Sequence, residues 1–226
     1  MNKESIVNTN EALFLGRRAL ELEKKPSIGT ILIIVGIDPS KNGENIDNPL
    51  LWTTMEKKSK EATNKFEGQI SFPADTRKIG EDIMHNAIGS LAEFSDNERL
   101  IRGALSLMPS SFIEKAISVK GNLVDLAVVI FDESLTCPII PLDLNEVDPN
   151  GWMSMDRLKK EDPSRLRSFV REIIAMEDKM DSPIKRVIAD YLKFEQARIP
   201  LSAILPSGFS MVDFYNQRER LPDMVK

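Results

Sequence analysis

Residues 30 to 37 read Thr-Ile-Leu-Ile-Ile-Val-Gly-Ile, an uninterrupted run of mostly β-branched and apolar residues. Such a run predicts a β-strand, and the lack of polar residues at alternate positions predicts that both of its faces are buried. A sheet built around this strand needs a covering layer on each side. The run therefore constrains the chain to an α/β fold with a sandwiched sheet.

A second unit follows between residues 68 and 94. A short strand is predicted at Gln69–Phe72, a turn at Pro73 and a loop around Gly80. A helix is predicted from Glu81 to Phe94, because Met84, Ala87, Ile88 and Leu91 are spaced for one buried stripe. Backbone N–H groups in such a loop, with carboxylates one helical turn apart, can hold a diphosphate and its metal ions.

The lead-in to this unit resembles a known family. Residues 68–73 read Gly-Gln-Ile-Ser-Phe-Pro, similar to the Gly-Gln-aliphatic-small-Phe-Pro-Gly-Gly of the coenzyme A pyrophosphatase-like branch of Nudix hydrolases. Here Ala74-Asp75 replaces the paired glycines. The resemblance covers roughly residues 28 to 160, with further similarity at 50–53, 146–147 and 151–153. It implies an α/β/α sandwich of the Nudix type with a mixed β-sheet.

The Nudix box itself is degenerate. Aligning Glu81 with the first Glu of the box gives three matching positions, which are Glu81, Leu91 and Glu93. Five positions depart from the pattern, which are Asp75, Gly89, Ser90, Phe94 and Asp96. Gly89 and Ser90 fall on the Arg-Glu pair of the family, and Phe94 falls on a metal-binding Glu. Because a serine hydroxyl is neutral and phenylalanine offers no ligand atom, most of the metal site is expected to be lost.

The resemblance implies a role for several residues. Glu93 and Glu81 would be the metal-binding residues, with Mg²⁺ or Mn²⁺ if the protein is active. Glu146, in a late loop, would be the general base or an extra metal ligand. The substrate-binding residues would be Gln69, Phe72, Asp75 and Trp152; for Trp152, packing at the sheet edge and stacking on a base are both open.

Composition excludes several classes of function. The chain has 226 residues, 42% hydrophobic and 29% charged, with a net charge of -5. This acidic balance argues against broad nucleic-acid binding. No apolar run approaches the ~18 residues of a membrane span, and the polar N-terminus predicts a cytoplasmic protein. With one cysteine and one histidine, an intramolecular disulfide is impossible and a Cys/His zinc site is not expected.

The sequence predicts three regions. Residues 1–27 contain an N-terminal helix, residues 28–160 form the Nudix-like domain, and residues 161–226 form a helical C-terminal extension. Two amphipathic helices are expected there, one beginning at Pro163 and one at Pro183. The tail from Ile199 onward either docks on the domain or a partner, or is loose.

Three functional hypotheses follow. The first is a non-hydrolytic module that binds a nucleotide-like or diphosphate-linked ligand in a cleft between the sheet and the box helix, or that forms a homodimer or binds a protein through its terminal helices. The alternative is a Mg²⁺- or Mn²⁺-dependent pyrophosphohydrolase of nucleoside-diphosphate-linked or coenzyme A-type substrates, with a rewired site that uses Glu93, Glu81, Asp75 and Glu146. A third is a structural subunit.

Overall fold

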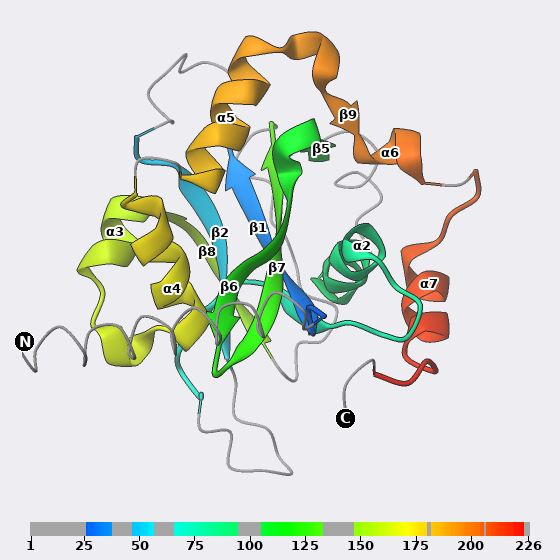
Figure 1. Ribbon diagram of the computed structural model, residues 1–226, viewed down its shortest axis with the longest axis horizontal. Helices are drawn as coiled ribbons and strands as arrows, with labels where there is room; N and C mark the ends of the chain where they lie inside the picture. Colours follow the sequence, from blue (N-terminus) through cyan, green and yellow to red (C-terminus); the bar gives the residue numbers. More distant parts are fainter. Residues whose placement is uncertain are drawn as a thin grey trace, which may run out of the picture.

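A mixed β-sheet forms the centre of the computed structural model (Figure 1). The structure describes residues 26–37, 47–56, 66–94, 105–132, 147–179, 182–205 and 207–223. The expected N-terminal helix, Cys137 and Glu146 lie outside these ranges.

The described strands are β1 (Gly29–Gly36), β2 (Leu50–Glu56), β3 (Ile70–Ser71), β4 (Ala74–Thr76), β5 (Leu105–Leu107), β6 (Phe112–Val119), β7 (Asn122–Phe131), β8 (Val147–Ser154) and β9 (Ile199–Pro200). The described helices are α2 (Ile83–Phe94), α3 (Met155–Lys160), α4 (Ser168–Glu177), α5 (Pro183–Lys193), α6 (Leu201–Ile204) and α7 (Met211–Arg218). Short 3-10 turns occur at Pro109–Ser111, Pro163–Arg165 and Glu195–Ala197.

The strand order is β3-β2-β1-β7-β5-β9. Three further strands pair beside this path, β4 with β1, β6 with β7 and β8 with β2. The β1–β7 pair is parallel, with Thr30 beside Asp125 and Gly36 beside Phe131, while β1 pairs with β2 and β4 in the antiparallel sense. The sheet is therefore mixed, as predicted.

Strand β1 is buried along its whole length, as its sequence predicts. Its alternate side chains enter two separate apolar cores because successive residues of a strand point to opposite faces. Ile31, Ile33 and Val35 belong to one core, and Leu32 and Ile34 belong to the other. Each core therefore needs its own helical cover.

Helices supply both covers (Figure 1). The first core is closed by α3, α4 and α5, through residues such as Leu158, Ile173 and Ile188. The second core is closed by α2 and α6, through residues such as Leu91 and Leu201. The predicted α/β/α sandwich is confirmed.

A hairpin turn at Lys120-Gly121 joins β6 to β7. Lys120 and Gly121 have φ angles of 52° and 82°. Two consecutive residues with positive φ make a turn whose twist suits paired strands, and glycine adopts this conformation without a steric penalty. The turn places Lys120 at the tip of the hairpin.

The C-terminal region is joined to the sandwich by backbone contacts. Strand β9 pairs with β5, and Arg167 donates its backbone N–H to the carbonyl of Ile70 at 3.0 Å. The helix expected to begin at Pro163 begins at Ser168 instead. A 3-10 turn precedes it, and Leu166 then forms a parallel bridge with Ile70, which requires extended backbone. The tail docks on the sandwich through α6 and α7.

Helices α4 and α5 pack against each other, and a buried carboxylate links them. Glu177, at the end of α4, is 2% exposed and accepts hydrogen bonds from the Ser182 hydroxyl and, at 3.1 Å, from the Ile184 backbone N–H. The side chain thus satisfies N–H groups at the start of α5. Burial raises the pKa of Glu177 above its ordinary value, although these hydrogen bonds oppose the shift.

None of the helices in the described ranges is long and apolar enough to cross a membrane.

We predict that Glu177 makes stability depend on pH. Because its pKa is raised on folding, its contribution is most favourable below the ordinary carboxyl pKa and declines as pH rises through the higher folded value. In Glu177→Gln the side chain stays neutral, so this decline disappears and the variant is more stable than wild type above that window. Urea unfolding between pH 4 and pH 8 measures the effect. Glu172→Gln, on the exposed face of α4, is the control and should follow the wild-type curve.

Candidate functional site

The strand–loop–helix unit forms as predicted. Strand β3 leads through Pro73 to β4, which pairs with the start of β1 so that Thr76 lies beside Gly29. A Cβ atom on Gly29 would lie 2.4 Å from the Asp75 carbonyl oxygen, so only glycine allows this approach. At the start of α2, Asp82 accepts a hydrogen bond from the His85 backbone N–H at 2.8 Å, which caps the helix.

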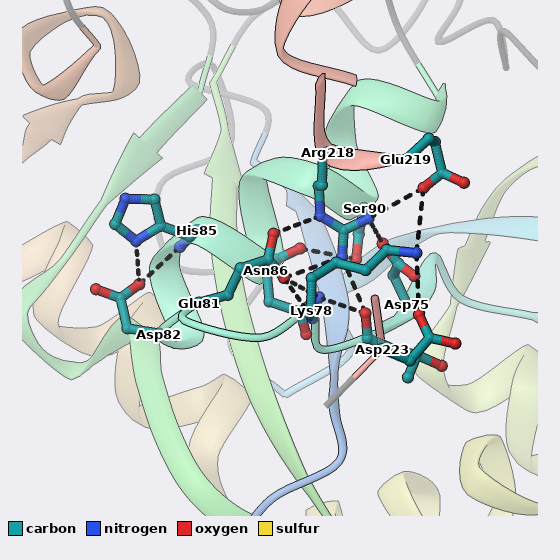
Figure 2. A network of polar contacts seen from close by, with 11 residues as sticks. Asp75, Lys78, Glu81, Asp82, His85, Asn86, Ser90, Arg218, Glu219 and Asp223 are labelled. Carbon is teal, nitrogen blue, oxygen red and sulfur yellow. Dashed lines mark hydrogen bonds and ion pairs between the residues drawn. The ribbon is translucent and has the colours of Figure 1, made fainter. Parts of the chain in front are cut away.

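Glu81 is held by a buried arginine, Arg218, from the C-terminal helix α7 (Figure 2). Its Oε1 accepts a hydrogen bond from Arg218 Nε at 2.6 Å, and its Oε2 accepts one from Arg218 Nη2 at 3.1 Å. Oε2 also accepts the backbone N–H of Lys78 at 2.9 Å. The side chain of Glu81 is 8% exposed. Both of its oxygens are therefore engaged within the protein.

Arg218 ends α7 and is 2% exposed. Besides Glu81, its guanidinium forms an ion pair with Asp75 and donates to the Thr76 carbonyl at 2.9 Å. Glu219 Oε1 also lies 3.7 Å from Arg218 Nη1, so three carboxylates and one carbonyl surround a single cation. Burial raises the pKa of Asp75 above its ordinary value, and the positive charge of Arg218 opposes but does not cancel that shift.

Gly89 makes room for this arginine. A Cβ atom at position 89 would lie 2.4 Å from Arg218 Nε and 2.7 Å from Cζ. No side chain fits at that separation, so the guanidinium occupies the space next to the helix backbone. The position that carries arginine in the Nudix pattern is here a glycine that faces an arginine from α7.

Lys78 adds a second attachment for the C-terminal segment. Its Nζ lies 3.0 Å from Asp223 Oδ1 and 3.5 Å from Glu219 Oε1. The backbone N–H of Ile79 also donates to the Pro222 carbonyl at 3.0 Å. Together with Arg218, these contacts hold residues 218–223 against the loop that precedes α2 (Figure 2).

The remaining polar residues on this side of α2 are directed inward. Asn86 is fully buried and donates to the Thr76 carbonyl at 3.2 Å. Ser90 is also fully buried, and its hydroxyl donates to the Asn86 carbonyl one turn earlier at 3.2 Å. The hydroxyl thus forms a hydrogen bond within its own helix.

These residues do not fit the divalent ions of a Nudix site. Mg²⁺ and Mn²⁺ need several hard oxygen ligands that are free to coordinate. Glu81 and Asp75 already contact a guanidinium, and Ser90 is neutral and committed to α2. Across the described ranges, no group of three or more acidic, histidine or cysteine side chains is arranged to hold a metal ion.

The other predicted site residues lie apart from one another. Gln69 donates its side-chain amide to the Ser164 carbonyl at 2.8 Å. Phe72 is 2% exposed within the first core. Trp152 packs against the second core, with its ring 5.5 Å from that of Phe131. Their proposed contacts with substrate stay predictions.

The structure describes only part of the residues predicted to bind metal or to act as the base. Glu93 lies within α2, but its side chain is outside the described part of the structure, as is the whole of Glu146. Their roles also stay predictions. Among the predicted site residues that the structure describes, Asp75 and Glu81 lie close together, and both contact Arg218.

A ligand cleft between the sheet and α2 was expected, and it stays a prediction. Among the described residues, apolar side chains that include Ile88 and Leu91 of α2 line a cavity of only about 10 Å³ there. The apolar stripe of α2 packs closely against the sheet at this point.

A larger cavity of about 320 Å³ lies at the beginning of β1. Its lining includes Asp75 from β4, Lys120 from the hairpin tip, and Arg167 and Phe169 from the start of α4. The Arg167 guanidinium is 2.7 Å from Glu56 Oε1 and lies 3.9 Å from the centre of the Phe66 ring. This volume is near the lower end of the ~300–1,000 Å³ typical of ligand pockets.

Sequence reasoning missed Arg218 altogether. The available signal was indirect, because a box that keeps Glu81 but carries Gly89 in place of arginine leaves a carboxylate without a partner. Nothing in the tail distinguishes Arg218 from its neighbour Arg220.

Comparisons with known proteins give similarity only at the level of structure. No family model and no curated protein sequence matches the chain. A Nudix hydrolase from M. smegmatis is 14% identical, with a TM-score of 0.40 over 69% of this chain and 90% of its own. A NUDIX hydrolase from Nitrosomonas europaea is also 14% identical, with a TM-score of 0.40 over 80% of this chain and 97% of its own.

A MutT/nudix family protein from Enterococcus faecalis is 12% identical, with a TM-score of 0.36 over 96% of this chain and 92% of its own. The layers, the mixed sheet and the strand–loop–helix unit of the chain itself define its fold.

We predict that Gly89 and Arg218 are energetically coupled. Glycine to alanine inside a helix ordinarily stabilises by about 0.5–1 kcal/mol. Here Gly89→Ala should instead destabilise by ~1–3 kcal/mol, because its Cβ displaces Arg218. In an Arg218→Ala background the same change should regain its ordinary stabilising sign. A double-mutant cycle from urea unfolding measures the coupling, and additive effects would contradict the predicted contact.

Proposed function

We propose that this protein is a non-hydrolytic, Nudix-like binding module that takes a small anionic ligand, such as a nucleotide or another diphosphate-linked molecule. One observation carries the proposal. The described acidic residues of the box, Asp75 and Glu81, are bound to Arg218 rather than free to coordinate metal ions. Hydrolysis of the Nudix type depends on such ions to stabilise charge and activate water.

The ~320 Å³ cavity at the beginning of β1 supports the ligand-binding part of the proposal. Lys120 and Arg167 bring positive charge to its lining. Cationic side chains suit a phosphate group. Asp75 also lines the cavity, but its negative charge is compensated by Arg218.

Binding of a protein partner through the terminal helices is a weaker proposal. The apolar stripes of α4 and α5, including Phe169, Ile173, Ile184 and Ile188, are buried inside the chain. These stripes are therefore not available to a second subunit.

We predict that the protein does not hydrolyse diphosphates. In the presence of Mg²⁺ or Mn²⁺, nucleoside diphosphate sugars, dinucleotides and coenzyme A should yield no nucleoside monophosphate or 4'-phosphopantetheine above background. Chromatographic product analysis measures this. Metal-dependent turnover that is lost in Glu93→Gln would contradict the proposal and favour the pyrophosphohydrolase alternative.

We also predict that the cavity at the beginning of β1 binds a compound from the same set of nucleoside diphosphate sugars, dinucleotides and coenzyme A. Isothermal titration calorimetry should detect binding of at least one of them without metal. Lys120→Ala should weaken that binding by about tenfold, because one charged hydrogen bond to phosphate is lost. Lys160→Ala, an exposed lysine on α3, is the matched control and should bind like wild type. Equal affinities for all three proteins would exclude this cavity as the site.

A further inference from the structure

The cavity at the beginning of β1 has an apolar part. Ile28, Ala74 and Val119 line it, and Ile28 and Val119 pack against the first core. Ala74 lies opposite Ile31 in the β4–β1 pair, so its methyl group is on the face of the sheet that carries the first core. Ile28 and Val119 are half-buried and Ala74 is exposed, so apolar surface is open to a ligand here.

The two cationic side chains of the lining are held over one aromatic ring. Arg167 Cζ lies 3.9 Å and Lys120 Nζ lies 5.5 Å from the centre of the Phe66 ring, so the two charges are less than about 10 Å apart. Glu56 compensates the charge of Arg167 through a contact of 2.7 Å with Nη1. Among the described residues, no carboxylate forms an ion pair with Lys120. The ammonium group of Lys120 is therefore the cation that a ligand can neutralise.

We propose that the ligand of this cavity is an organic phosphate with an aliphatic body. Its phosphate contacts Lys120, and its aliphatic part lies against Ile28, Ala74 and Val119. An aliphatic chain gains free energy when it leaves water for these side chains, whereas a sugar would lose hydrogen bonds to water there. This inference deepens the proposed function and rests on it, because it names the class of anionic ligand that the cavity takes.

Calorimetric titration of the full chain with simple phosphates tests this. The probes are inorganic phosphate, ethyl phosphate, n-butyl phosphate and glycerol phosphate. Wild type should bind n-butyl phosphate about tenfold more tightly than ethyl phosphate, because two further methylene groups leave water. Glycerol phosphate should bind no more tightly than ethyl phosphate, because its hydroxyl groups find no gain against an apolar lining.

Two variants separate the apolar part of the site from its charge. Ala74→Gln places a polar side chain beside the apolar lining and should abolish the gain from ethyl to n-butyl phosphate. Lys120→Ala should weaken the binding of both alkyl phosphates by the same factor, because the phosphate contact is common to them. Ala203→Gln, at an exposed alanine of α6, is the matched control and should bind all four probes like wild type.

The inference is overturned if wild type binds n-butyl phosphate no more tightly than ethyl phosphate, or if Ala74→Gln keeps the full gain. The comparison of probes uses wild type alone, so it decides the matter even if a variant does not fold. Binding of phosphates without a gain from the aliphatic chain would overturn this inference and leave the proposed anion site in place. If neither these probes nor the nucleotides and coenzyme A bind, the ligand-binding part of the proposed function fails as well.

Discussion

The ion pair that buries Arg218 between Glu81 and Asp75 determines how the C-terminal segment fits against the strand–loop–helix unit. Removing a guanidinium from water costs roughly several kcal/mol. That cost is offset only where negatively charged oxygens surround the group. Here the carboxylates come from β4 and from the loop before α2, while the arginine comes from α7. None of the three segments can keep its charges buried without the other two.

This arrangement changes what the box can do. A metal ion exchanges with solvent and can polarise a bound phosphate, whereas an arginine is covalently part of the chain and offers no open coordination position. In the proposed function, the oxygens of Asp75 and Glu81 are structural because they contact the arginine of α7. Ser90 fits this interpretation, because its hydroxyl is buried and bonded to the helix backbone. The strand–loop–helix frame of the box is present, but its charges stabilise the fold.

Much of the fold could be predicted because the relevant signals are local. The continuous apolar run of β1, the stripe of α2 and the turn at Lys120-Gly121 each lie within about a dozen neighbouring residues. The start of α4 was wrongly predicted, because a long-range bridge between Leu166 and Ile70 keeps that segment extended. Where α2 packs on the sheet, its apolar stripe joins the second core.

The sequence by itself determined the sandwich, the degenerate box and the residues at its altered positions, since periodicity and spacing are properties of neighbouring residues. Only the tertiary structure decided which cation pairs with Glu81, because position 89, where the Nudix pattern has arginine, is here a glycine. Arg218 and Glu81 are 137 positions apart, and no local pattern connects them. Their pairing depends on the docking of α7 against α2 at Gly89, because a buried charge finds its partner through the packing of whole elements.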